Sequence, residues 1–146
     1  MALLSTKKRV LVVDDSILMR KMISQIINAQ EDMEVIGTAK DGVEALEMAH
    51  TLCPDVVTLD VEMPKMNGLQ FLETVMPKEP QRVLMLSSLT HAGATATLEC
   101  LQRGAMDFLA KPSGSISLNI GEHSEEIVGK IRSLAMARRP NPIQIK

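Results

Sequence analysis

The sequence predicts an α/β protein built on a five-stranded parallel sheet, and three observations support this fold class. Short runs of β-branched and aliphatic residues alternate with segments of helical periodicity along the chain. Such alternation favours a parallel sheet covered by helices on both faces. The length of 146 residues suits one domain with one core. Acidic residues and a lysine directly follow three of the apolar runs, where open parallel sheets bind their ligands.

The strands are expected near residues 9–14, 33–38, 55–59, 82–87 and 106–110. Five strand–helix units suggest a doubly wound (βα)5 sheet of the flavodoxin-like type, whose strand order is 2-1-3-4-5. In that order the first and third strands are neighbours at the switch point. Their carboxyl ends therefore meet, although they are far apart in the sequence.

The first two helices have clear boundary signals. Ser16 is a suitable N-cap for the first helix. Asp41 caps the second, with Glu44 three residues later. This second helix should end near Cys53, because Pro54 disfavours helical backbone at the residue before it. One face of the first helix is apolar with i, i+3, i+4 spacing, and it comprises Met19, Met22, Ile23, Ile26 and Ile27.

The remaining three helices are expected near residues 67–75, 92–102 and 122–138. Gly104 should end the fourth helix, and Arg138 and Arg139 suit the negative end of the fifth helix dipole. Residues 113–121 are rich in Ser and Gly and favour a loop. The domain should span residues 7–138, and residues 139–146, which include Pro140 and Pro142, are typical of a linker.

Composition excludes several classes of protein. The net charge of −2 gives no sign of the excess positive charge typical of nucleic-acid-binding proteins. No apolar run approaches the ~20 residues of a membrane helix, and Lys7, Lys8 and Arg9 interrupt any signal peptide. The two cysteines, Cys53 and Cys100, form no C-x-x-C pair and are expected to be reduced thiols in a cytoplasmic protein.

Three carboxylates and one lysine are expected to converge at the carboxyl edge of the sheet. Asp14 and Asp15 follow the first strand, Asp60 follows the third, and Lys111 follows the fifth. At ~4 Å and an effective dielectric constant of ~20, each pair of like charges costs about 4 kcal/mol. The cluster therefore requires compensating cations, and Lys111 with a divalent metal would supply them.

This arrangement suits phosphoryl chemistry. Magnesium is commonly held by one or two carboxylates. An Asp that keeps one carboxylate oxygen free can attack a phosphoryl group with that oxygen. The metal and Lys111 would neutralise the charge of the phosphoryl group. Ser87, at the end of the fourth strand, offers a hydroxyl to the product. A single acidic residue at a strand end is more often a turn former or a cap, so the prediction depends on the complete set.

The chain resembles bacterial response-regulator receiver domains over residues ~7 to 138. The segments that carry the resemblance are Val12–Ser16 (VVDDS), Leu59–Gly68 (LDVEMPKMNG), Leu86–Ser88 (LSS) and Gly104–Pro112 (GAMDFLAKP). Each of them contains or directly follows the end of a predicted strand. The resemblance implies the following roles: Asp60 as phosphoacceptor, Asp14, Asp15 and the backbone carbonyl of Glu62 as magnesium ligands, Ser87 as switch hydroxyl, Lys111 as phosphate contact and Phe108 as rotating aromatic residue.

Two further expectations follow from this resemblance. The Lys111–Pro112 peptide would be cis, as in the family. Phe108 has no hydroxyl to bond outward, so its exposed orientation should be less favoured than in relatives with a tyrosine.

A closer resemblance is to the receiver half of chemotaxis protein-glutamate methylesterases. It is carried by residues 87–101 (SSLTHAGATATLECL), Asp60–Pro64 and Lys111–Gly114. In that family a linker and a serine-hydrolase domain follow the receiver. This chain has no G-x-S-x-G, and its histidines (His50, His91 and His123) have no triad context. The chain is therefore expected to be the regulatory half, with the hydrolase activity in a domain that lies outside it.

The resemblance implies a phosphorylation switch. A chemotaxis histidine kinase would phosphorylate Asp60, and the surface of the fourth helix, fifth strand and fifth helix would change and regulate a methylesterase domain in cis. A weak homodimer is left open. The alternatives are a stand-alone single-domain regulator, a docking module that needs no phosphorylation, and an aspartate-nucleophile phosphatase. The phosphatase would require Asp-x-Asp, whereas Glu62 occupies the second acidic position here.

Overall fold

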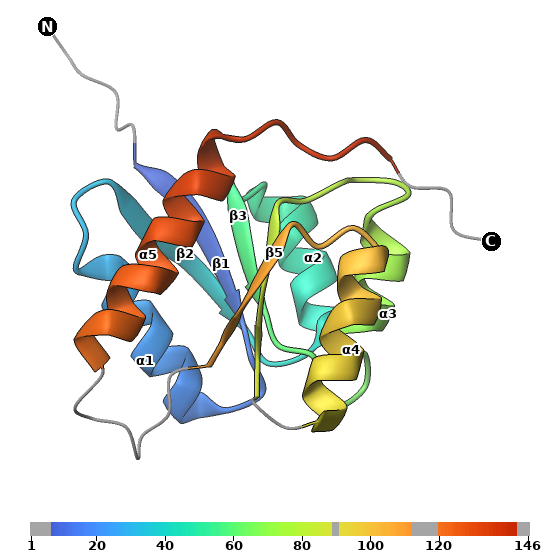
Figure 1. Cartoon of the computed structure of the whole chain (residues 1–146). Helices are drawn as coiled ribbons and strands as arrows, with labels where there is room; N and C mark the ends of the chain where they lie inside the picture. The colour runs from blue at the N-terminus through green and yellow to red at the C-terminus, as the bar shows by residue number, and fades with distance from the viewer. Residues whose placement is uncertain (1–6, 89–90, 112–119, 143–146) are drawn as a thin grey trace, which may run out of the picture.

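Five parallel strands form one sheet in the order β2-β1-β3-β4-β5, which confirms the predicted order. The structure is a computed structural model that describes residues 7–88, 91–111 and 120–142 (Figure 1). Strands and helices alternate along the chain. The strands are β1 (Lys8–Val13), β2 (Met33–Ala39), β3 (Val56–Leu59), β4 (Val83–Ser87) and β5 (Asp107–Ala110). The helices are α1 (Ile17–Asn28), α2 (Gly42–Leu52), α3 (Gly68–Val75), α4 (His91–Gln102) and α5 (Ile120–Met136).

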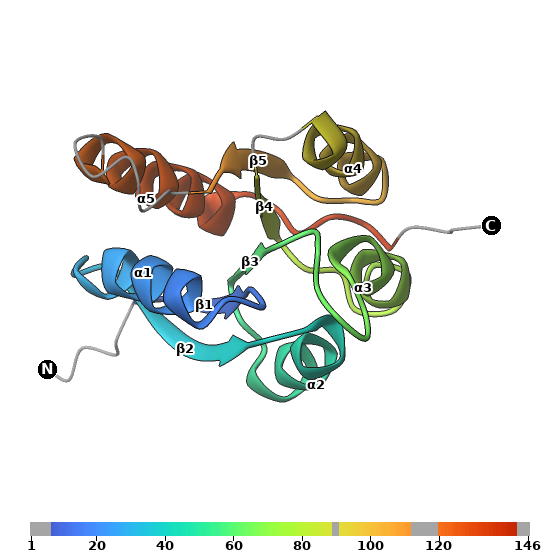
Figure 2. The same ribbon diagram turned by 90° about the horizontal axis from the view of Figure 1, so that it is seen from below.

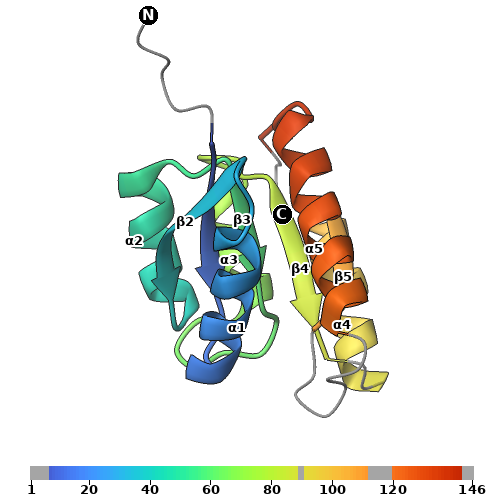
Figure 3. The same ribbon diagram turned by 90° about the vertical axis from the view of Figure 1, so that its left-hand side faces the viewer.

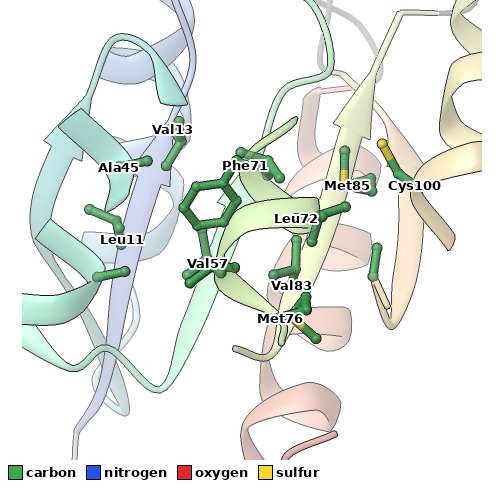
Figure 4. Packing of buried hydrophobic residues seen from close by; sticks show 14 of the residues in the cluster. Leu11, Val13, Ala45, Val57, Phe71, Leu72, Met76, Val83, Met85 and Cys100 are labelled. Atoms are coloured by element: carbon green, nitrogen blue, oxygen red, sulfur yellow. The ribbon is translucent and has the colours of Figure 1, made fainter. Parts of the chain in front are cut away.

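The helices cover both faces of the sheet, as Figure 2 shows. Side chains alternate between the two faces of a strand, so Val10 and Val12 of β1 pack on the side of α1 and α5. Leu11 and Val13 belong to the cluster on the opposite side, which also includes residues of α2, α3 and α4. Figure 4 shows this second cluster, in which Phe71 of α3 is fully buried. The two clusters determine which side chains of a strand face each layer of helices.

Capping residues define several helix ends, as predicted. The Ser16 hydroxyl accepts a hydrogen bond from the Met19 N–H at 3.2 Å, and Asp41 caps α2 in the same way. Cys53 ends α2 in the left-handed conformation with φ of 50°. Gly104 follows α4 with φ of 112°, a conformation that glycine adopts without strain.

The prediction for the fifth helix was displaced by two residues. Helix α5 begins at Ile120 and ends at Met136 instead of spanning 122–138. Part of the expected loop, residues 120–121, is therefore helical, and residues 113–119 lie outside the described part. Arg139 lies beyond the helix and donates hydrogen bonds to the carbonyls of Pro80 at 3.2 Å and Pro54 at 3.0 Å. These contacts tie the chain after α5 to the amino-terminal end of the sheet.

The parallel strands bring their carboxyl ends to one edge. In Figure 3 the arrowheads of β1, β2 and β4 point to the same, lower edge of the molecule. The residues that follow β1, β3, β4 and β5 therefore surround the crevice where such sheets bind ligands. Within the described residues, no helix combines the length and the apolar character that crossing a membrane requires.

Candidate functional site

The pairing of β1 with β3 places Asp14 beside Asp60. Val13 is the partner of Leu59 in the parallel ladder, and the next residue of each strand is an aspartate. The Asp60 N–H donates to the Val13 carbonyl at 3.0 Å, which continues the ladder to the site. Both aspartates are buried, Asp14 at 1% and Asp60 at 4% exposure. Buried carboxylates this close to each other need cations.

Lys111 supplies one cation from the last strand. Its N–H donates to the Ser87 carbonyl at 2.9 Å, which extends the β4–β5 pairing by one residue. Its Nζ lies 2.9 Å from Asp60 Oδ1 and 3.1 Å from Asp14 Oδ2. The prediction that the ends of strands one, three and five converge is thus confirmed by geometry.

The three aspartates form a cluster suited to a hard cation. One carboxylate oxygen each from Asp14, Asp15 and Asp60 lies within 4.8 Å of the others. Asp14 Oδ1 accepts the Ser16 N–H at 2.9 Å. Asp14 Oδ2 is buried and has only its ion pair with Lys111, with no hydrogen bond from the described residues. A carboxylate oxygen in that state, next to an exposed carboxylate on Asp15, fits the oxygen ligands that magnesium prefers.

The site perturbs the acidity of its own groups. Burial raises the pKa of Asp60 to about 6, and the charge of Asp14 adds to the rise, while Lys111 opposes it. Burial acts to lower the pKa of Lys111, but the ion pairs with Asp60 and Asp14 outweigh it and the pKa rises. A carboxyl group that resists ionisation without a further cation is consistent with a site that binds a metal.

The chain after β3 is held closely against α3. The Gly68 N–H donates to the Val61 carbonyl at 2.8 Å. A Cβ at Gly68 would lie 2.4 Å from the backbone oxygen of Asp60, so only glycine fits there. Glu62 is exposed beside this turn. The role of its carbonyl as a metal ligand stays a prediction.

Ser87 and Phe108 lie on β4 and β5 beside a cavity of about 280 Å³. The cavity is bounded mainly by apolar side chains from α4 and β5, among them Ala94, Leu98 and Ala110. Phe108 is 49% exposed, although an outward orientation was expected to be less favoured. The cavity next to its ring is open in this conformation. Pro112 lies outside the described residues, so the cis Lys111–Pro112 peptide stays a prediction.

Two residues near the site were not identified from the sequence. Arg20 on α1 donates from Nη1 to the Asp14 carbonyl at 2.7 Å and supports the turn that carries Asp14 and Asp15. Thr97 on α4 places its hydroxyl oxygen 2.9 Å from the Ser87 hydroxyl oxygen. Helical spacing could have placed Arg20 near the N-terminus of α1, but no sequence signal identifies the partner of Thr97.

Residues 10–119 match the family model of the response regulator receiver domain. Because the match covers most of the chain, the protein belongs to this family, as the sequence analysis predicted. Receiver domains generally bind Mg²⁺ at an acidic pocket, and this chain has an acidic cluster of Asp14, Asp15 and Asp60.

The chain is similar to a protein-glutamate methylesterase/protein-glutamine glutaminase from Pyrococcus abyssi, with 53% identity over 95% of this chain and 38% of the relative. It therefore spans less than half the length of that relative. Among solved structures it is similar to the response regulator domain of Thermotoga maritima CheB, with 51% identity, 90% of this chain and 98% of that chain covered and a TM-score of 0.80. The CheX–CheY–BeF3–Mg²⁺ complex from Borrelia burgdorferi matches at 32% identity over 89% of this chain and 90% of that chain, with a TM-score of 0.71.

These comparisons identify the class of receiver domain to which the chain belongs. It is a receiver domain homologous to the amino-terminal domain of chemotaxis methylesterases.

Proposed function

We propose that Asp60 accepts a phosphoryl group from a chemotaxis histidine kinase with the help of Mg²⁺, and that this modification switches the domain. The contact of Lys111 Nζ with Asp60 Oδ1 at 2.9 Å carries the proposal. Lys111 Nζ is a cation on one oxygen of a buried carboxylate, and the neighbours Asp14 and Asp15 would complete a metal site with it. The solved CheX–CheY complex from Borrelia burgdorferi, to which the chain is similar, contains BeF3 and Mg²⁺.

The transfer is a displacement at phosphorus. A carboxylate oxygen of Asp60 forms the new O–P bond as the N–P bond to the kinase histidine breaks, and the imidazole leaves and takes up a proton from solvent. The product is an acyl phosphate on Asp60. Lys111 would remain next to the phosphoryl oxygens and offset their charge.

Magnesium would be held by Asp14, Asp15, Asp60 and the backbone carbonyl of Glu62. When bound, it neutralises the charge that develops on the phosphoryl oxygens. The chain's own residues do the rest. Ser16 orients Asp14 through its N–H, and Arg20 holds the Asp14 carbonyl.

The output of the switch is proposed to be the surface of α4, β5 and α5. Ser87 would turn its hydroxyl to the phosphoryl group, and Phe108 would move into the cavity beside α4. Residues 139–146 would begin the linker to a methylesterase domain, which this surface would regulate in cis. The relatives that carry such a domain support this assignment, and a cytoplasmic location follows from it.

An NMR titration tests the proposal, since the chain has no Trp or Tyr for intrinsic fluorescence. Beryllofluoride with Mg²⁺ should shift the amide resonances of Asp60, Ser87 and Phe108 in the wild type. The variant Asp60→Asn should not respond, and neither should the wild type in EDTA. Unchanged wild-type resonances at these positions would refute the proposal.

A further inference from the structure

We propose that Thr97 is a positioning residue that holds the Ser87 hydroxyl in the unphosphorylated conformation and so opposes the switch. The inference rests on the proposed function, because Ser87 matters only if Asp60 is phosphorylated. The observation behind it is the hydrogen bond between the two hydroxyl oxygens, which are 2.9 Å apart and link β4 to α4.

The number of protons limits the direction of this hydrogen bond. Thr97 Oγ1 also lies 2.8 Å from the Gly93 carbonyl, one helical turn earlier. A hydroxyl has one proton, and a carbonyl can only accept. In the arrangement we assign, Thr97 donates to Gly93, as helix threonines commonly do to the carbonyl four residues earlier, and Ser87 donates to Thr97. The Ser87 proton is then committed to α4, and it cannot be donated to a phosphoryl oxygen at the same time.

Burial raises the free-energy cost of breaking this hydrogen bond. Ser87 is 6% and Thr97 is 4% exposed. Water does not readily replace a partner that leaves a buried hydroxyl, so breaking the bond has a cost that an exposed pair would not have. If Ser87 turns to a phosphoryl group, the Thr97 oxygen loses its donor. That cost favours the unphosphorylated conformation.

The same hydrogen bond forms part of the wall of the cavity beside α4. Ser87, Thr97 and Phe108 all line this cavity. Phe108 remains 49% exposed while the hydrogen bond is in place. Release of Ser87 would therefore remove the tie between β4 and α4 at the space that the Phe108 ring would enter. Thr97 thus couples the position of α4 to the hydroxyl that senses Asp60.

The test is the affinity for beryllofluoride in excess Mg²⁺, measured by NMR for three variants. Thr97→Val replaces the hydroxyl with a methyl group of similar size, and we expect about three- to tenfold tighter binding than in the wild type. Thr97→Ser keeps the hydroxyl and should bind like the wild type. Thr74→Val removes a similar hydroxyl–carbonyl contact, from Thr74 to Gln70 on the exposed side of α3, and should also bind like the wild type.

A double-mutant cycle separates the proposed coupling from a general loosening of α4. Thr97→Val introduced into Ser87→Ala should change the affinity by less than about twofold, because the partner hydroxyl is already gone. In the absence of beryllofluoride, the Ser87 and Phe108 amide resonances of Thr97→Val should move toward their positions in the wild-type complex.

Unchanged or weaker binding by Thr97→Val would overturn the role of Thr97, and so would an equal gain in the Ser87→Ala background. A wild-type protein that does not respond to beryllofluoride would refute the proposed function itself. The two failures are therefore distinguishable.

Discussion

Lys111 Nζ lies 2.9 Å from Asp60 Oδ1 and joins the end of β5 to the end of β3 across the intervening strand β4. The lysine is 19% exposed and the Asp60 side chain 5%. Removal of one partner from an ion pair this buried destabilises the protein, because the other charge stays in a poorly solvated site.

Removal of the lysine should destabilise the protein in the absence of metal. We expect Lys111→Met to lower the free energy of unfolding by about 2–4 kcal/mol at neutral pH, because two buried carboxylates lose their cation. Added Mg²⁺ should restore part of the loss. Urea denaturation with EDTA or with Mg²⁺ measures both effects. The control is Lys130→Met, which breaks a more exposed ion pair with Asp107 and should cost less than about 1 kcal/mol. Equal losses in the two variants would contradict the prediction.

Stability should depend on pH through Asp60. Its pKa is about 6 in the folded protein and about 3.8 in the unfolded chain, so the folded state binds this proton more tightly. The contribution of Asp60 to stability is therefore greatest below pH ~4 and declines as pH rises to ~6. Without metal, Asp60→Asn should be more stable than the wild type by about 1–3 kcal/mol at pH ~8 and similar to it at pH ~4. Thermal unfolding across this range measures the difference, and a less stable variant at pH ~8 would rule the explanation out.

Two glycine substitutions should change the free energy of unfolding in opposite directions. Gly68→Ala places a Cβ 2.4 Å from the Asp60 backbone oxygen, and the turn must shift to admit it. We expect a loss of about 1–3 kcal/mol and weaker binding of beryllofluoride. Gly129 lies within α5, and apart from the neighbouring backbone of that helix nothing lies within 4 Å of a Cβ added there. Gly129→Ala should therefore stabilise the protein by about 0.5–1 kcal/mol. Chemical denaturation of both variants provides the comparison, and a neutral Gly68→Ala would show that the turn adapts freely.

The two cysteines should differ in reactivity. Cys53 is exposed, whereas Cys100 is buried, and burial raises the pKa of its thiol to about 12. A thiol-specific reagent at mildly alkaline pH should therefore modify one cysteine in the native protein and both in denaturant. Cys53→Ser should leave the native protein unreactive. Rapid modification of Cys100 in the native state would mean that α4 opens readily.

The sequence was sufficient to predict the strand order and the convergence of Asp14, Asp60 and Lys111. The alternating apolar runs predict the fold class, and the strand order was taken from the flavodoxin-like type of that class. Given this order, the convergence follows because parallel strands end at the same edge. Helix caps such as Ser16 and Asp41 were also predictable, because each cap depends on residues within one turn.

Other features depend on contacts between distant residues, and local patterns do not encode them. Arg139 was interpreted as a complement to a helix dipole, but it donates to carbonyls of Pro54 and Pro80 across the end of the sheet. The pairing of Thr97 with Ser87 requires the packing of α4 on β4. The cavity beside Phe108 likewise has walls from α4, β4 and β5, which are separate in the sequence.

Direct mapping of the modified residue tests the central claim. The protein would be incubated with a radiolabelled small-molecule phosphoryl donor and Mg²⁺, and its labelling would be measured. In a parallel sample, borohydride would reduce the acyl phosphate, which releases phosphate and leaves an alcohol in place of the carboxyl group, and mass spectrometry would locate the reduced residue. The expected result is labelling that requires Mg²⁺, with the reduced product at position 60, and no labelling of Asp60→Asn. Labelling at another residue, or labelling of Asp60 that is unaffected by EDTA, would contradict it.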